Sequence, residues 1–272
     1  MPATLIDIGA NLTHDSFDSD RAEVIARARD MGISAMIVTG SDIAHSHKAL
    51  ELCHAYPGTL YCTAGIHPHQ AKNFAADALQ TLRNLLVNPE VVAVGECGLD
   101  YFRNFSPHAA QLTCFEAQLQ LAAETRKPVF LHQRDAHADF MAVLNRYRQQ
   151  LSVAVAHCFT GSEAELLDYL SLDLHIGITG WICDERRGSH LRELMKLIPA
   201  NRLMLETDAP YLLPRDLKLK PRAHRNEPMY LAHICDVVAT CIGKSAEQIG
   251  AETTANAQCF FKLPMHQAVG VK

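Results

Sequence analysis

The sequence lacks several features that would assign a class of protein at once. No run of residues approaches the roughly 18 uncharged apolar positions that a membrane-spanning helix needs. Neither of the common glycine-rich phosphate loops, G-x-G-x-x-G or G-x-x-x-x-G-K-[ST], is present. The start, MPATLIDIGANLTHDSF, has no basic stretch ahead of an apolar one, so it does not resemble a signal peptide. We therefore expect a protein without a membrane segment or signal peptide, and without a nucleotide-binding loop.

Cysteine is plentiful, but the spacing of a disulfide or zinc framework is missing. The nine cysteines are scattered, their number is odd, and no two form a C-x-x-C pair. Most lie in apolar runs, as Cys62 and Cys97 do. Buried, reduced thiols are the expected state, which is typical of a cytoplasmic protein.

The overall composition is that of a folded globular protein. Hydrophobic residues make up 48% of the 272 positions, and 25 Lys and Arg against 30 Asp and Glu give a net charge of −5. The length suits one large α/β domain with a sizeable core. No linker, low-complexity tract or internal repeat interrupts the chain, so we expect a single domain over residues 1–272.

Short apolar runs alternate with longer helical ones along the chain. The predicted strands are 5–9, 35–38, 60–64, 91–94, 128–131, 153–156, 174–178 and 203–205. The predicted helices between and after them include 106–125, with Ser106 as N-cap and Pro107 in the first position. Eight strands, each followed by a helix, predict an α/β fold of the (β/α)8 TIM barrel type. Extra C-terminal helices are expected at about 226–262. A doubly wound open sheet is the alternative, although it usually has fewer strands.

Metal-ligating side chains follow several of the predicted strands. Glu96 follows the fourth strand, His132 the fifth and His157 the sixth. A TIM barrel places its chemistry at these carboxyl ends, so the three side chains should meet. Imidazole and carboxylate groups bind Zn²⁺, Mn²⁺, Fe²⁺ or Mg²⁺, and three protein ligands leave positions open for water and substrate. Asp208, after the eighth strand, is the candidate general base.

Several motifs together resemble one family. They are G-I-H-P-H, V-G-E-C-G-L-D, P-V-F-L-H-Q-R-D-A, H-C-F-T-G and L-M-L-E-T-D-A-P-Y-L, with R-N-E-P at 225–228. In this order and spacing the chain resembles the TatD-type metal-dependent deoxyribonucleases from Ile6 to about Phe261. The resemblance implies a barrel of the amidohydrolase type that hydrolyses phosphodiester bonds in nucleic acid.

The resemblance also implies roles for individual residues. Glu96, His132 and His157 match the family's metal ligands. Asp208 matches its catalytic acid and is a further candidate ligand of the metal. The implied cofactor is a divalent metal ion, with Mg²⁺ favoured over Mn²⁺ or Zn²⁺.

One departure from the family pattern lies at the end of the first strand. The family usually has D-x-H-x-H there, whereas Gly9 and Asn11 occupy the histidine positions in this chain. The subgroup with N-L-T at this point implies 3′–5′ exonuclease action on single-stranded DNA, extending to RNA, with a role in DNA repair or degradation. Two arrangements stay open: Glu96 binds one ion, or Asn11 and Asp208 hold a second, hydrated one. Fewer nitrogen ligands favour a hard ion such as Mg²⁺.

Basic and aromatic residues are frequent in the loops expected at the same rim. The segment 215–225 is densely basic, and such a patch suits a phosphate backbone. Aromatic residues in these loops are candidates for stacking unpaired bases: Tyr101, Phe102, Phe105, Trp181 and Tyr211. The candidate substrate-binding residues are His67, His69, Arg134, Arg225 and Asn11.

Two other classes of function stay open at this point. A hydrolase of small-molecule esters or amides would use the same barrel and metal. A non-catalytic barrel with a degenerate metal site would explain Gly9 and Asn11. We expect a monomer with a nucleic acid substrate, preferably single-stranded. The preference for DNA or RNA, the strand polarity and the native metal are not decided by the sequence.

Overall fold

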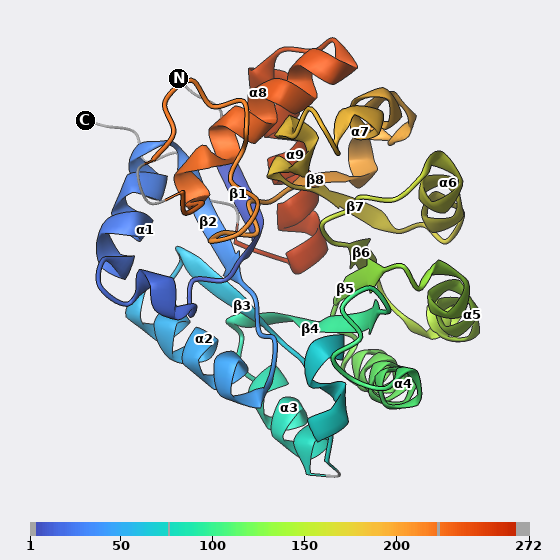
Figure 1. Cartoon of the computed structure of the whole chain (residues 1–272). Coiled ribbons are helices and arrows are strands. Elements are labelled where there is room, and N and C mark those ends of the chain that lie inside the picture. Colours follow the sequence, from blue (N-terminus) through green and yellow to red (C-terminus); the bar gives the residue numbers. More distant parts are fainter. Residues whose placement is uncertain (1–3, 76, 222–223, 265–272) are drawn as a thin grey trace.

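The strands of the protein form a barrel inside a ring of helices (Figure 1). The computed structural model describes residues 4–75, 77–221 and 224–264. Within these residues eight strands pair in parallel, in the order β1 to β8. They are β1 (Leu5–Ala10), β2 (Ile33–Val38), β3 (Leu60–Ala64), β4 (Val91–Asp100), β5 (Val129–Arg134), β6 (Ala154–Ala156), β7 (His175–Ile178) and β8 (Leu203–Leu205). A doubly wound sheet would reverse its strand order, so the predicted (β/α)8 barrel is confirmed.

Hydrogen bonds close the seam between the first and last strands of the barrel. The backbone N–H of Asp208 donates to the carbonyl of Gly9 at 2.8 Å. The buried carboxylate of Asp7 accepts from the backbone N–H of Thr207 at 2.9 Å and from its hydroxyl at 2.5 Å. This closure brings Asn11 next to Asp208, although 197 positions separate them in the chain.

Helices cover the outside of the barrel. Those in the described part of the chain are α1 (Arg21–Asp30), α2 (Ile43–Ala55), α3 (Ala78–Leu86), α4 (His108–Thr125), α5 (His137–Tyr147), α6 (Glu163–Ser171), α7 (Ser189–Leu194), α8 (Leu231–Ile242) and α9 (Ala246–Phe261). Helices α8 and α9 are the extra C-terminal helices that the sequence predicts (Figure 1). Short 3-10 helices include η4 (Gly180–Cys183) and η7 (Pro228–Tyr230). No described helix combines the length and the apolar character that crossing a membrane would need.

The core has an inner and an outer layer because side chains alternate along each strand. Ile6 and Ile8 of β1 belong to the cluster inside the barrel, whereas Leu5 belongs to the cluster under the helices. Ala10 also belongs to the cluster under the helices, because the pairing of β1 with β2 is irregular between Asp7 and Ala10. Phe260 of α9 joins the inner cluster. Helix α9 also lies against the strand starts, as Asn256 donates to the carbonyl of Leu203 and Thr254 to that of Thr4. The end of the barrel where the strands begin is therefore covered, and chemistry is left to the opposite end.

Two local predictions need correction. Strands β4 and β5 run on to Asp100 and Arg134, well past the predicted ends at 94 and 131, so Glu96 and His132 lie within strands and not in loops. Ser106 does not cap α4, because Pro107 holds that place. The Ser106 hydroxyl instead accepts from the backbone N–H of Lys72 and donates to the carbonyl of His69, which fastens the loop after β3.

Candidate metal and catalytic centre

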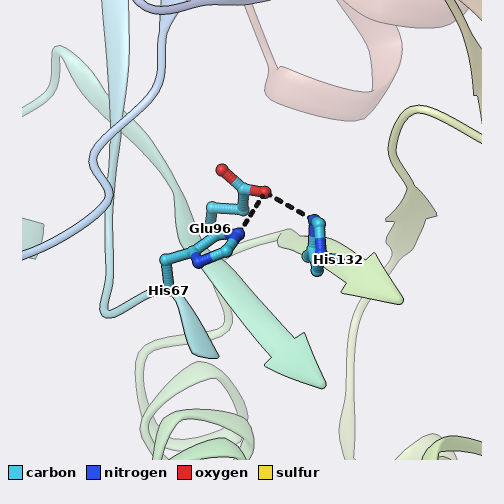
Figure 2. A group of neighbouring side chains, drawn as sticks. All are labelled: His67, Glu96 and His132. Carbon is cyan, nitrogen blue, oxygen red and sulfur yellow. Dashed lines mark ion pairs between the residues drawn. The ribbon is translucent and has the colours of Figure 1, made fainter. Parts of the chain in front are cut away.

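Three imidazole nitrogens converge on one carboxylate oxygen at the carboxyl end of the barrel. Oε1 of Glu96 lies 2.9 Å from Nδ1 of His132, 3.0 Å from Nε2 of His157 and 3.3 Å from Nε2 of His67. Figure 2 shows the side chains of His67 and His132 pointing toward the Glu96 carboxylate between them. The structure thus brings together three of the four residues that the sequence predicts as metal ligands, and it places His67, predicted as a substrate contact, beside the same oxygen.

The register of β4 against β5 places Glu96 beside His132. Gly98 of β4 pairs with His132, and a side chain on Gly98 would lie only 1.8 Å from the His132 carbonyl oxygen. Gly98 also has a φ of +147°, which L side chains rarely adopt. Glycine at this position therefore permits the close approach of the two strands. In the same strand, the backbone N–H of Glu96 donates to the carbonyl of Gly40 at 2.9 Å. This bond holds the backbone of β4 in place at the residue that carries the carboxylate.

The charges in this cluster depend on one another. Burial alone would raise the pKa of Glu96, but the imidazoles of His67, His157 and His132 outweigh it and hold the pKa well below its ordinary range. Burial would lower the pKa of His157, yet the carboxylates of Glu206 and Glu96 raise it well above its ordinary value. Burial lowers the pKa of His67 to about 4. The carboxylates therefore require a compensating positive charge, which protonated imidazole or a bound cation provides.

The donor set fits a divalent metal ion. The ligating atoms of His67, Glu96 and His132 all lie within 4.8 Å of one another, so one ion can reach all three. His157 offers Nε2 to the same Glu96 oxygen at 3.0 Å, and its Nδ1 lies 3.0 Å from Glu206. A carboxylate on the far nitrogen of a ligating histidine fixes the tautomer that leaves the near nitrogen free to bind. Nitrogen and carboxylate ligands suit Zn²⁺, Mn²⁺ and Fe²⁺, and Mg²⁺ less readily.

The side chain of Glu206 occupies the space that a histidine at position 9 would need. A Cβ on Gly9 would lie 2.5 Å from Oε2 of Glu206 and 3.1 Å from the ring of Phe130. A Cβ on Gly177 of β7, on the other side of β8, would lie 2.5 Å from Oε1 of Glu206. The Glu206 carboxylate, fully buried, therefore fills the space beside both glycines. An imidazole at position 9 has no room while Glu206 is in place.

Asp208 lies beside the cluster and is held by Asn11. The side-chain amide of Asn11 donates to Oδ1 of Asp208 at 2.9 Å. Burial raises the pKa of Asp208 to about 7, with the nearby carboxylates adding to the rise and His157 opposing it. Both residues line the same cavity as Glu96 and His157. The arrangement provides a carboxylate that can exchange a proton close to the predicted ligands.

Four of the five predicted substrate contacts line the cavity, Asn11 among them, and one lies elsewhere. His67, His69 and Arg134 line it, with the Arg134 guanidinium 3.8 Å above the ring of Phe102. Arg225 is not among the lining residues. Its guanidinium pairs with Asp20 at 2.7 Å and with Glu227 at 2.9 Å, and it also donates to a backbone carbonyl.

The cavity is wide, with basic and aromatic groups at its rim. Its volume is about 1060 Å³, above the roughly 300–1,000 Å³ of pockets for small ligands. Arg103, Arg134 and Arg187 line it. Phe102 and Tyr211, also lining residues, are 54% and 52% exposed.

The densely basic segment 215–225 contributes less to this rim than the sequence suggests. Arg215 pairs with Asp184 and Glu185, and Lys218 and Lys220 are exposed. None of these basic residues lines the cavity. Residues 222–223 lie outside the described part of the chain.

Two carboxylates near the cluster were not assigned roles from the sequence. Glu206 holds His157, and its Oε1 accepts from the backbone N–H of Cys158 at 2.5 Å. Asp100 lies 2.8 Å from Nε2 of His69 and 3.4 Å from Nε2 of His132. In the sequence Asp100 lies four residues after Glu96 and Glu206 two residues before Asp208, and both lie within the motifs that resemble the family.

Comparison with known proteins agrees with this geometry. Residues 6–262 match the family described as TatD related DNase. A 3′-5′ ssDNA/RNA exonuclease TatD from Pantoea vagans is 53% identical over 259 residues, which cover 95% of this chain and 100% of the relative. A solved structure of YJJV, a TatD homologue from Escherichia coli, has a TM-score of 0.88 and 28% identity, covering 97% of this chain and 100% of that one. A TatD family hydrolase from Entamoeba histolytica has a TM-score of 0.86, also at 28% identity, covering 96% of this chain and 98% of that one.

The barrel and its cluster of histidines and carboxylates define a metal-dependent hydrolase. The chain belongs to the family of TatD-related DNases, and its enzymatic class is that of the hydrolytic nucleases. The resemblance seen in the sequence motifs is therefore confirmed, and the substrate is nucleic acid.

Proposed function

We propose that this chain is a metal-dependent 3′–5′ exonuclease that degrades single-stranded DNA and RNA. The observation that carries the proposal is the convergence of three imidazole nitrogens on Glu96 Oε1, beside Asp208, at the base of a wide cavity. The polarity and the substrate are those in the name of the relative from Pantoea vagans, which is 53% identical. A role in DNA repair or degradation follows from this activity and is part of the proposal.

Each residue of the centre has a proposed task. Glu96, His132, His157 and His67 hold a divalent ion, with Asp208 at its edge. When bound, such an ion supplies Lewis-acid activation of water and of the phosphodiester group. Asp208 accepts the proton of the attacking water, and the amide of Asn11 keeps its carboxylate oriented.

Residues at the rim hold the substrate. Arg134 and His69 face the cavity, where a cationic or hydrogen-bonding group stabilises a phosphodiester as negative charge develops on it. The exposed rings of Phe102 and Tyr211 offer flat faces on which unpaired bases stack. Bases inside a duplex are stacked on both faces, whereas those of a single strand can stack on the rings, so these rings support a preference for single strands.

The native ion, the oligomeric state and the location complete the proposal. Mg²⁺ stays the predicted ion, although a centre with three imidazoles also suits Mn²⁺ and Zn²⁺. The imidazoles of one chain converge on Glu96 without a residue from a second copy, which is compatible with the proposed action as a monomer. All nine cysteines are free, and most are buried, which supports a cytoplasmic location, where thiols stay reduced.

The test is digestion of end-labelled oligonucleotides under a series of metal ions. Single- and double-stranded DNA and RNA carry a label at the 5′ end, and a second set has a blocked 3′ end. The proposal expects metal-dependent shortening of 5′-labelled single strands one nucleotide at a time, abolished by the 3′ block and by a chelator. Endonucleolytic fragments from blocked strands would contradict the polarity. Hydrolysis of an ester or amide panel without action on DNA would favour the small-molecule hydrolase instead.

A further inference from the structure

A second group of metal-ligating side chains lies outside the catalytic cavity. Cys183 ends η4, Asp216 belongs to the segment after β8, and His233 lies on α8. Their sulfur, oxygen and nitrogen ligand atoms all lie within 4.8 Å of one another. None of the three lines the cavity, and hydrolysis at the catalytic centre uses none of them. Three separate parts of the chain therefore deliver one donor each to a single point.

The side chains of this group contact one another, and two of them are accessible to solvent. Nε2 of His233 lies 2.6 Å from Oδ1 of Asp216, while Oδ2 of Asp216 lies 3.7 Å from the guanidinium of Arg192. Cys183 is buried, whereas the side chains of His233 and Asp216 are 29% and 34% exposed. The thiol thus forms the inner wall of the cluster, and the other two donors face solvent. An ion can enter from outside, and water can complete its coordination.

We propose that Cys183, Asp216 and His233 form a second metal site, which takes Zn²⁺ or another divalent ion that binds thiolate. Thiolate sulfur, imidazole nitrogen and carboxylate oxygen are the three ligand types that Zn²⁺ takes from proteins. A thiolate selects against Mg²⁺ and Ca²⁺, which prefer oxygen donors. Binding releases the thiol proton, so that thiolate and carboxylate together balance the two charges of the ion. The site is therefore independent of the catalytic ion.

The position of the site indicates what the ion does. Asp216 stands at the base of the exposed segment that contains Lys218 and Leu219, the latter 89% exposed. An ion bound here joins that base to the end of η4 and to α8. Its role is to hold the segment against the barrel, and removal of the ion frees the segment without removing the catalytic ligands.

Cobalt substitution of the full-length protein tests the site directly. Co²⁺ bound through a thiolate gives a charge-transfer absorption band in the near ultraviolet, which histidine and carboxylate ligands do not give. The wild-type protein should show this band and should bind one more equivalent of Zn²⁺ than the Cys183→Ser variant. His233→Asn should weaken the band at limiting Co²⁺. Cys259→Ser, which removes an exposed thiol on α9, is the control and should behave as wild type.

Limited proteolysis gives a second measurement that does not depend on spectroscopy. Zn²⁺ should slow tryptic cleavage after Lys218 in the wild type and in Cys259→Ser, but not in Cys183→Ser. Thermal unfolding in the absence of metal shows whether the variants are folded. Absence of a thiolate band in the wild type, or a band of equal strength in Cys183→Ser, would overturn the proposal. So would equal Zn²⁺ content in both proteins.

Discussion

Replacing Glu206 by glutamine tests whether this buried carboxylate orients His157 for metal binding. In the native protein Oε1 of Glu206 accepts from the backbone N–H of Cys158 at 2.5 Å, and Oε2 lies 3.0 Å from Nδ1 of His157. A glutamine has one acceptor and one donor group in the same places. The backbone N–H of Cys158 needs an acceptor, so the amide oxygen of glutamine must face Cys158 and its NH₂ must face Nδ1 of His157. His157 then carries its proton on Nε2, the nitrogen that faces Glu96.

That tautomer has no lone pair to offer a metal ion. Loss of such an orienting partner typically lowers metal affinity by about 10–100-fold, or roughly 1.4–2.7 kcal/mol. Isothermal titration of metal-free Glu206→Gln with Mn²⁺ should show this loss. Glu165→Gln, which removes a carboxylate from the lining of the same cavity without touching a predicted ligand, should bind as wild type. A folded Glu206→Gln protein with unchanged Mn²⁺ affinity would show that Glu206 does not orient His157 for metal binding.

Three further predictions concern other parts of the structure. Gly9→His should lower the unfolding free energy by about 1–3 kcal/mol and add no metal ion, since Glu206 occupies the space; an extra equivalent of bound metal would contradict this. Asp100→Asn should weaken metal binding by about tenfold, because His132 loses a carboxylate neighbour 3.4 Å away; titration with unchanged affinity would argue against that role. His175 is buried, and burial lowers its pKa from 6.5 to about 4 in the folded protein. As the pH falls from 6.5 to about 4, His175 takes up a proton in the unfolded chain but not in the folded one, so the free energy of unfolding decreases over this range. In denaturant titrations, the free energy of unfolding of His175→Gln should decrease by about 3 kcal/mol less than that of the wild type over this pH range. An equal decrease in both proteins would exclude His175 as its source.

The barrel and the convergence of the candidate ligands could be predicted from the sequence because both depend on local patterns. The strand at residues 60–64 is a short apolar run between turn residues, and its predicted bounds agree with β3. Glu96, His132 and His157 follow apolar runs, and in a barrel every such end meets the same rim. Their convergence could therefore be predicted without knowing a distance.

Contacts between distant segments could not be predicted in this way. Arg225 looked like a phosphate contact because it ends a basic segment, yet its partner Asp20 lies 205 positions away. The exclusion of an imidazole at Gly9 depends on Glu206, which reaches it only when β8 closes against β1. Contacts between residues about 200 positions apart leave no periodicity or local motif in the sequence from which they could be predicted.

In the proposed function, Asp208 removes a proton at a metal centre built on Glu96 and its histidines. The most direct test compares wild type with Asp208→Asn in single-turnover hydrolysis of a single-stranded oligonucleotide, with bound metal measured on the same samples. We predict a rate at least about a hundredfold lower, with the metal ion retained. A rate near that of the wild type, with metal in place, would contradict the claim.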